Sequence, residues 1–203
     1  MKKIFEDIVR HKRWKKSMCG PGSTIGYTQN LREQLKPFLI KHKIKSMFDA
    51  PCGDYSWMSL INVHEIVDYI GGDIVDFMIL ENQKKYTTVN FQIFDLTVDP
   101  IPDVDLLFCR DCLLHLSFKD IDNVFKNISR SNIKYILTSN WFEDATNDRD
   151  IQTGSWRYLN FLESPFNFGQ PLDSIIDYVD GFPRREILLW SKSVIDTYNK
   201  NRI

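Results

Sequence analysis

Long apolar runs are missing from this 203-residue sequence, and a transmembrane helix, which needs about 18 or more of them in succession, is therefore not expected. The first residues, MKKIFEDIVRHKRWKK, also lack the hydrophobic centre of a secretory signal peptide, so we expect a cytoplasmic protein. The sequence also lacks a large excess of positive or of negative charge. The formal net charge of −1 provides no general attraction to nucleic acid or to an anionic membrane.

Cysteine is scarce, and the four thiols are Cys19, Cys52, Cys109 and Cys112. The last two form the pair CRDC, which is compatible with a redox centre or with half of a zinc site. A zinc ribbon needs a second pair at similar spacing, and the sequence has none. Because the apolar segment VDLLF precedes Cys109, we expect this thiol to end a strand and to pack there as a free cysteine.

Segments with the hydrophobic pattern of a strand alternate along the chain with segments that have the pattern of a helix. The expected strands are residues 45–50, 67–74, 89–96, 104–109, 134–141 and 185–194, and the expected helices are residues 1–16, 28–42, 55–62, 75–86, 118–131 and 171–179. This alternation predicts an α/β fold with a doubly wound, mostly parallel sheet that helices cover on both faces. The polar and aromatic residues 142–170 interrupt it, and we expect them to cap the ligand edge of the sheet.

A chain of this length is expected to form one domain with a sizeable core. We divide the domain, residues 1–203, into four parts. These are N-terminal helices and a lid (1–45), a cofactor-binding core (46–140), a substrate cap (141–171) and a C-terminal helix with the last strands (172–203).

Acidic residues end three successive expected strands: Asp49, Asp73 and Asp95. Open α/β sheets bind ligands at the carboxyl ends of their strands. Asp73 follows Asp49 by 24 residues, which is the spacing at which an acid commonly accepts hydrogen bonds from the two hydroxyls of a ribose. A single acid at a strand end is as readily explained as a helix N-cap, but three in succession favour a ligand site.

Glycine is scarce where a dinucleotide site would need it. The turn after the first strand, DAPCGD, contains only Gly53, whereas a pyrophosphate site requires the pattern GxGxxG. This disfavours a dehydrogenase. A cationic ligand without phosphate groups suits a turn with several acids around it, and S-adenosylmethionine is such a ligand.

The chain resembles the class I S-adenosylmethionine-dependent methyltransferases. The resemblance covers roughly residues 20–140 and rests on FDAPCGD, YIGGDI, FDL and VDLLFCRDCLLHLS. It extends to a subgroup of small enzymes with DAPCGD, CRDCLxHLS and PFNF, which are often associated with polysaccharide biosynthesis. It implies a Rossmann-like sheet of seven strands with a small cap insertion.

The resemblance also implies roles for individual residues in binding S-adenosylmethionine. Asp49 and Gly53 would border its methionine part, and Asp73, with Ile74 beside it, would contact the ribose. Asp95 and Leu96 would contact the adenine, and Arg110 would lie beside the cofactor.

The first motif departs from the family pattern, because Pro51 and Tyr55 replace the glycines on either side of Gly53. Proline fixes the turn through its ring. The loop GPGSTIGY offers further contacts to the amino acid tail of the cofactor through the hydroxyls of Ser23, Thr24 and Tyr27 and the backbone of Gly22. The same loop is also compatible with an ordinary surface turn.

Methyl transfer to a hydroxyl requires a general base, and histidine has a suitable pKa. His115 follows the fourth strand in CRDCLLHLS, where this fold brings the acceptor to the methyl group. Asp111 lies four residues earlier, so on a helix the two side chains share a face. Asp111 either orients the imidazole or is itself the base; alternatively, His115 only packs against the sheet.

The expected cap contains Arg149, Trp156 and Arg157, which suit a sugar ring and a phosphate or carboxylate group. A simple covering role for the sheet edge is the alternative. Asn147, Asp148 and Asp150 do not follow strands, so we expect no metal ion. The basic face of residues 1–16, which includes Lys15 and Lys16, is either a solvated surface or a positive rim for a phosphorylated substrate.

The sequence thus predicts O-methylation of a carbohydrate or sugar-phosphate hydroxyl in glycan biosynthesis, with a small-molecule or glycan acceptor as partner. One alternative is an RNA or protein methyltransferase that uses the basic N-terminal helix. The chain has no Asn/Asp-Pro-Pro-aromatic motif for base nitrogens, and nucleic acid is not an expected partner. Another is a cofactor-binding subunit without catalytic activity.

Overall fold

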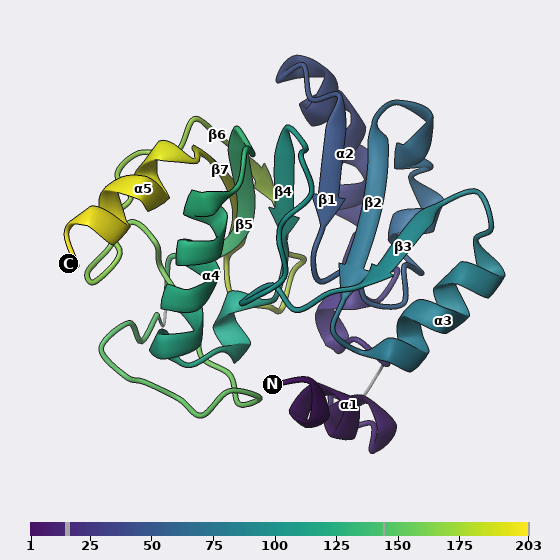
Figure 1. Cartoon of the computed structure of the whole chain (residues 1–203), viewed down its shortest axis with the longest axis horizontal. Helices are drawn as coiled ribbons and strands as arrows, with labels where there is room; N and C mark the ends of the chain where they lie inside the picture. The colour runs from purple at the N-terminus through teal and green to yellow at the C-terminus, as the bar shows by residue number, and fades with distance from the viewer. Residues whose placement is uncertain (15–16, 144, 203) are drawn as a thin grey trace.

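The computed structural model describes residues 1–14, 17–143 and 145–202 (Figure 1). Its centre is one sheet of seven strands in the order β3-β2-β1-β4-β5-β7-β6. The strands are β1 (Ser46–Asp49), β2 (Asp68–Asp73), β3 (Asn90–Ile93), β4 (Leu106–Cys109), β5 (Tyr135–Trp141), β6 (Asp173–Ile176) and β7 (Arg185–Ser191). The first five run parallel, whereas β7 is antiparallel to both β5 and β6. The predicted α/β fold with a mostly parallel, seven-stranded Rossmann-like sheet is confirmed.

Helices cover both faces of this sheet. They are α1 (Lys2–Arg10), α2 (Gln29–Lys41), α3 (Asp76–Lys85), α4 (Phe118–Arg130) and α5 (Ser193–Lys200). Figure 1 shows α2 behind the sheet and α4 and α5 in front of it. Among the described residues, no helix combines the length and the apolar character needed to cross a bilayer.

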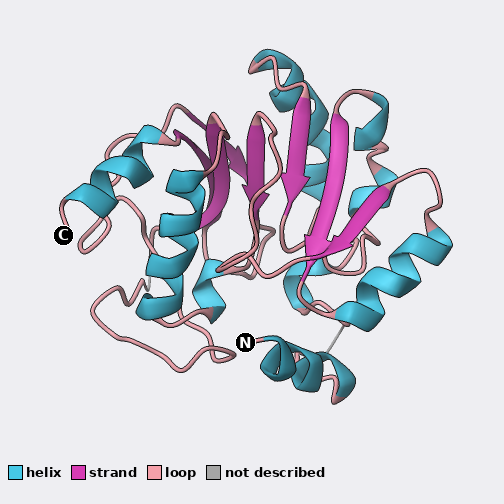
Figure 2. Ribbon diagram, in the orientation of Figure 1, coloured by secondary structure: helices cyan, strands magenta, loops and turns pink. Residues whose placement is uncertain are grey.

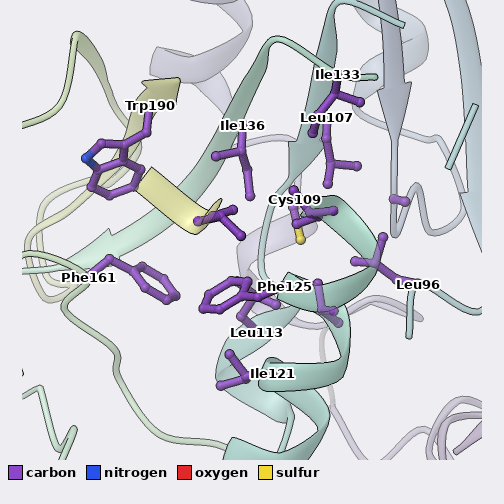
Figure 3. Packing of buried hydrophobic residues seen from close by; sticks show 14 of the residues in the cluster. Leu96, Leu107, Cys109, Leu113, Ile121, Phe125, Ile133, Ile136, Phe161 and Trp190 are labelled. Carbon is purple, nitrogen blue, oxygen red and sulfur yellow. The ribbon is translucent and has the colours of Figure 1, made fainter. Parts of the chain in front are cut away.

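The core against α4 shows how the sequence pattern produces this packing. Apolar residues recur every three or four positions in α4, and Ile121, Val124, Phe125 and Ile128 are all buried. Ser117 caps the helix by accepting a hydrogen bond from the Asp120 backbone N–H at 3.2 Å. Figure 3 shows Phe125 beside Phe161 from the cap region, and Phe161 in turn contacts Trp190 from β7. The same cluster contains Cys109, whose thiol is free, as predicted.

Three expected helices differ from the structure. Residues 171–179 were expected to be helical, but 173–176 form β6, because Ile175 pairs with Ile187 across the sheet and is buried there. Residues 55–62 contain only the 3₁₀ helix η2 (Met58–Leu60), since Tyr55 has φ +57° and Asn62 has φ +52°. The expected helix 1–16 ends at Arg10; Lys15 and Lys16 lie outside the described residues.

The last expected strand also ends early. It was expected over residues 185–194, but β7 stops at Ser191 and α5 begins at Ser193. The sequence after Ser191 places Ile195 and Tyr198 three positions apart, and both are buried against α4. Packing on α4 therefore gives this segment a helical form.

One edge of the sheet collects the carboxyl ends of the parallel strands. Figure 2 shows the arrowheads of the central strands at the edge nearest α1. Asp49 and Asp73 end β1 and β2, Asp95 follows β3 by two residues, and Arg110 follows β4 directly. Side chains that are far apart in the sequence are consequently brought to one place.

Helix α1 lies across this edge and is held at both sides. Val9 packs with Val75 and Met78, and Lys2 forms an ion pair with Asp76 of α3. On the other side α1 approaches Gly154 so closely that a Cβ atom at this position would lie 2.5 Å from Cγ2 of Ile4. The glycine has φ +98°, a conformation that side chains disfavour.

We predict that Gly154→Ala detaches α1 from the cap region and lowers the free energy of unfolding by about 1–3 kcal/mol. Urea denaturation measures this loss, and limited trypsin digestion measures the exposure of Lys2, Lys3 and Arg10 in α1. Gly181→Ala is the matched control, because Gly181 has φ +88° and an added Cβ would meet nothing within 4 Å. Equal stability losses and equal digestion in the two variants would contradict a specific contact with α1.

Candidate active site

A cavity of about 520 Å³ opens at the carboxyl edge of the sheet. Its wall is formed by the ends of β1 to β5, by α1, by the turn around Pro21–Ser23 and by the cap region. This volume lies within the range of about 300–1,000 Å³ that small-molecule sites occupy. Most of the chemically functional side chains that the sequence predicted line it.

Asp49 lies at the floor of the cavity and is only 2% exposed. Burial raises the pKa of its carboxyl to about 7, although a hydrogen bond from Tyr69 and the charge of Arg110 oppose the shift. The Tyr69 hydroxyl donates to Asp49 Oδ2 at 2.6 Å. This single hydrogen bond leaves lone pairs on the carboxylate for a ligand.

Asp73 connects the two strand ends that flank the cavity. Its Oδ2 accepts a hydrogen bond from the Gly53 backbone N–H at 3.0 Å, and its Oδ1 accepts one from Val75 N–H at 2.9 Å. Burial raises its pKa to about 6, against the effect of these backbone donors. Each oxygen keeps a lone pair for a ligand hydroxyl. Ile74 is half-buried and lines the cavity beside it.

Asp95 and Leu96 line the cavity beyond β3. Asp95 Oδ1 accepts hydrogen bonds from the backbone N–H and the hydroxyl of Thr97, at 3.0 and 2.6 Å. Asn127 of α4 donates to the carbonyl oxygen of Leu96 at 2.9 Å. The loop is thus held from both sides, by two residues that the sequence did not single out.

The turn after β1 has a form that explains its single glycine. Gly53 has φ +57°, and a Cβ atom there would lie 2.7 Å from the sulfur of Cys19. That sulfur accepts the Asp54 backbone N–H at 3.3 Å. Tyr55 also has φ +57°, but its ring is buried among other aromatic rings. Cys19 and Asp54 line the cavity and were not predicted.

Two arginines and two aspartates form a buried ionic cluster beside the acids, which we call the ionic quartet: Arg110, Asp111, Asp177 and Arg185. Arg110 binds Asp177 through two hydrogen bonds, of 2.9 and 3.1 Å, and donates to the Gly22 carbonyl oxygen at 2.7 Å. Arg185 contacts Asp111 Oδ1 at 2.6 Å and Asp177 Oδ2 at 2.7 Å. Paired in this way, the four charges compensate one another.

Asp111 faces the cavity from this quartet. Burial opposes its ionisation, but the charges of Arg185 and Arg110 outweigh burial and lower its pKa to about 2. The Ser139 hydroxyl also donates to Asp111 Oδ1 at 3.2 Å. Asp111 is therefore a fixed carboxylate and a weak base.

His115 lies near Asp111, but not on a shared helical face. A shared face requires a helix that contains both residues, but Asp111 has φ +54° and only Leu113–His115 form a 3₁₀ helix, η4. His115 Nδ1 lies 2.8 Å from the Ser155 carbonyl oxygen and so donates to it, which leaves Nε2 as an acceptor. Burial lowers the pKa of His115, and the hydrogen bond to Ser155 and the charge of Asp111 oppose the shift. The ring also contacts Trp14, with centroids 5.1 Å apart.

The loop GPGSTIGY contributes unevenly. Gly22, Ser23 and Tyr27 line the cavity, whereas Thr24 does not. The Ser23 hydroxyl donates to the Cys19 carbonyl oxygen at 3.0 Å, and the Thr24 hydroxyl donates to that of Pro21 at 3.0 Å. The Tyr27 ring lies 4.8 Å from the Arg185 guanidinium, a cation–π contact.

The cap region brings one of its three predicted side chains to the cavity. Trp156 lines it and is 61% exposed, and its ring contacts Tyr158, which stacks on Trp141 at 5.4 Å. Arg149 is exposed and does not line the cavity. Arg157 does not line it either.

Arg157 is buried inside the cap region instead. It stacks on Phe118 at 4.4 Å, and its Nη1 donates to the Leu116 carbonyl oxygen at 2.8 Å. Asn147 is also buried, and its side chain donates to the backbone of Asn160 and Ser164. These contacts hold the cap in shape, so the aromatic residues that line the cavity have a firm support.

The basic face of α1 is largely engaged by α3. Lys2 pairs with Asp76, and the Arg10 guanidinium lies 4.6 Å from the centre of the Phe77 ring. Arg13 and Trp14 follow the helix and line the cavity. Among the described basic residues of this segment, Arg13 is therefore the one that lines the cavity and gives its rim a positive charge.

No protein-family model matches the sequence, and no curated sequence is significantly similar to it. Solved structures, however, resemble the chain over nearly its whole length. Magnesium protoporphyrin IX methyltransferase from Synechocystis PCC 6803, with bound SAH, is 16% identical with a TM-score of 0.66, over 94% of this chain and 99% of that one. Phosphoethanolamine N-methyltransferase 1 from Haemonchus contortus is 12% identical with a TM-score of 0.64, over 99% of this chain and 53% of that one. The methyltransferase domain of bacterial CtHen1 is 11% identical with a TM-score of 0.60, over 81% of this chain and 99% of that one.

The chain has the class I methyltransferase fold. At these identities the comparison establishes the architecture, and the chemistry has to be argued from the cavity itself.

The raised pKa values of Asp49 and Asp73 predict how stability depends on pH. The native, ligand-free protein binds protons more tightly at these groups than the unfolded chain does. The stability that this binding contributes is complete below pH 4 and is lost as the pH rises to about 7. Asp49→Asn removes the buried charge, so the variant is expected to equal the wild type at pH 4 and to exceed its stability by about 2–4 kcal/mol at pH 8.

Urea denaturation between pH 4 and 8 measures this difference. Asp173→Asn is the control with the opposite sign, because Lys41 and His42 outweigh burial and lower the pKa of Asp173 to about 2. The control is expected to be less stable than the wild type at pH 8. A pH-independent difference between Asp49→Asn and the wild type would contradict the shifted pKa.

Proposed function

We propose that the protein is an S-adenosylmethionine-dependent methyltransferase that modifies a hydroxyl group of a carbohydrate or sugar phosphate. The observation that carries the proposal is the row of carboxylates Asp49, Asp73 and Asp95 along the cavity, next to a turn with one glycine. Such a wall repels phosphate groups and attracts a sulfonium and an ammonium group. The resemblance of the motifs to class I methyltransferases supports the same cofactor.

The residues at the cavity fit this cofactor. Asp73 has lone pairs for the two ribose hydroxyls, and Asp95 with Leu96 provides a polar and an apolar contact for the adenine. Asp49 has lone pairs for the ammonium group. Gly22 shows that the wall is tightly built, because a Cβ there would lie 2.7 Å from Asp111 Oδ2. When bound, S-adenosylmethionine supplies an electrophilic methyl group.

His115 is the general base that we propose. Its Nδ1 proton is held by the Ser155 carbonyl, so Nε2 accepts a proton from the acceptor hydroxyl. Its lowered pKa keeps the ring neutral at physiological pH. Asp111, with a pKa of about 2, instead orients the hydroxyl by accepting a hydrogen bond. This role differs from the two that the sequence left open for Asp111, which were to orient the imidazole or to act as the base.

The acceptor half of the cavity supports a sugar ring. Trp141, Tyr158 and Trp156 form a continuous aromatic surface, and Asp111 and Arg185 provide polar groups beside it. An apolar face with a few converging polar groups is what a small polar ring requires. Arg13 at the rim is suited to a phosphate substituent.

We predict that S-adenosylhomocysteine raises the melting temperature of the purified protein and that NAD and NADP do not. A ligand at about 100 times its dissociation constant adds roughly 2.7 kcal/mol of stability, which a thermal shift assay detects. Stabilisation by NAD alone would support a dehydrogenase, and no stabilisation by any of the three would favour a partner subunit without this cofactor.

We also predict that His115→Ala lowers turnover by about 100-fold or more, because the hydroxyl then loses its base. Transfer of labelled methyl groups to monosaccharides and sugar phosphates identifies an acceptor, with which the variant is measured. Wild-type turnover should fall with decreasing pH below about 6.5, and His115→Ala should lose this dependence. His64→Ala, at an exposed position, is the control. Near-native turnover in His115→Ala would point to an acceptor that needs no base.

A further inference from the structure

Asp177 is a buried acid that the sequence analysis did not single out. It follows β6 by one residue, and none of its side chain is exposed. Two guanidiniums surround it: Arg110 binds it through two hydrogen bonds, and Arg185 contacts its Oδ2 and donates to its carbonyl oxygen at 3.0 Å. A carboxylate this deep is costly unless both arginines remain paired with it.

Asp177 does not line the cavity, whereas Arg110 and Arg185 do. Any effect of Asp177 on a ligand must therefore pass through the two arginines. Arg110 is the more informative of them, because its Nη2 donates both to Asp177 Oδ1 at 3.1 Å and to the Gly22 carbonyl oxygen at 2.7 Å. Asp177 and Gly22 are joined through one guanidinium group.

The bond to Gly22 is the hydrogen bond through which residues 20–24 themselves attach to the sheet, and it supplements the bond of the adjacent Cys19 sulfur to Asp54. Among the described residues, the other hydrogen bonds of this turn connect positions no more than four apart, such as Ser23 to Cys19 and Thr24 to Pro21. Local bonds preserve the shape of a turn but do not fix its position on the protein. Arg110 fixes the position of the Gly22 carbonyl oxygen, and Asp177, the carboxylate with the closest contacts to Arg110, orients its guanidinium; Asp111 Oδ2 lies farther from Arg110, at 3.4 Å.

The order of the strands shows which part of the cavity this turn borders. Along the carboxyl edge, Asp95 follows β3, Asp73 ends β2, Asp49 ends β1 and Arg110 follows β4. The proposed nucleoside contacts thus lie at the β3 and β2 end. The turn and Arg110 lie past Asp49, at the end where the amino acid tail of the proposed cofactor would be.

We infer that Asp177 is a positioning residue for the cofactor's amino acid tail. It holds Arg110, Arg110 holds Gly22, and the backbone of the turn with the hydroxyl of Ser23 then meets the tail in a fixed geometry. This inference rests on the proposed function. Without the charge of Asp177, Asp111 is the remaining carboxylate of the quartet, and Arg110 is expected to turn toward it and release the Gly22 carbonyl oxygen.

Isothermal titration calorimetry with two ligands tests this role. S-adenosylhomocysteine contains the amino acid tail, and 5′-methylthioadenosine has the same nucleoside without it. Asp177→Asn is expected to weaken S-adenosylhomocysteine binding by about 10-fold or more, because the tail then loses a positioned, charge-assisted contact. The same variant should bind 5′-methylthioadenosine within about 2-fold of the wild-type affinity. A merely structural role would weaken both ligands alike.

Asp173→Asn is the matched control, since Asp173 begins the same strand and is ion-paired with Lys41 at a distance from the cavity. It should leave both affinities unchanged. Gly22→Ala is the second variant in case Asp177→Asn does not fold. The added Cβ would lie 2.7 Å from Asp111 Oδ2, on a surface turn, and should weaken S-adenosylhomocysteine selectively.

Equal weakening of the two ligands in both variants, or unchanged S-adenosylhomocysteine binding, would overturn the role of Asp177 while leaving the proposed function intact. A wild-type protein that binds neither ligand would overturn the proposed function, and the inference with it.

Discussion

The parallel pairing of β1 with β2 and β4 is the constraint on which the rest of the site depends. Because these strands run in the same direction and in register, Asp49 is level with Gly71 and Phe108, and Asp73 is level with Ile93. The acids that follow the strands must then lie at one edge, away from most compensating cations. Burial in this position raises the pKa of two of them, so the ligand-free site opposes folding at neutral pH. A cationic ligand would relieve this cost, which links affinity to the architecture of the sheet.

The same residue type has opposite properties in the two halves of the cavity. Asp49 is buried with one phenolic donor, and its pKa is raised to about 7, whereas Asp111 is half-buried beside two guanidiniums, and its pKa is lowered to about 2. The first exchanges a proton near neutral pH, and the second remains a charged acceptor. Two strands on either side of β5 supply this difference, because one arginine follows β4 and the other begins β7. The fold thereby places a carboxyl that titrates near neutral pH and a permanently charged carboxylate in the same cavity.

Much of the acidic half of the cavity could be predicted from the sequence, because its signals are local. Asp49, Asp73 and Asp95 each end a hydrophobic segment, and the position at a strand end follows from the segment itself. The ionic quartet could not be predicted in the same way. Asp177 lies in a segment whose pattern resembles a helix, and it becomes a strand-end residue only because Ile175 pairs with Ile187. From the sequence, Arg185 is only the first residue of an expected strand, because Asp111, with which it forms an ion pair, lies far away along the chain.

The cap shows a related limit of sequence reasoning. Arg157 and Trp156 are adjacent and equally suited in chemistry to a substrate, yet Trp156 lines the cavity and Arg157 is buried on the other side of the segment. An extended backbone points successive side chains in opposite directions, so only one of two neighbours can reach a ligand. Which of them does so depends on the bond from the Arg157 backbone N–H to the Leu114 carbonyl oxygen, a contact between distant segments.

Tyr55 explains how the turn after β1 forms with one glycine, where the methyltransferase motif that the sequence resembles has several. A left-handed backbone costs a non-glycine residue roughly 1–2 kcal/mol. The Tyr55 ring is nearly completely buried, with Tyr69, Tyr86 and Phe91 at centroid distances of 5.0 to 5.3 Å. Burying a large side chain contributes about 1.5–3 kcal/mol, and each favourable aromatic pair adds about 0.5–1.5 kcal/mol. Packing therefore offsets the backbone cost, and an aromatic core holds the turn that presents Gly53 to Asp73.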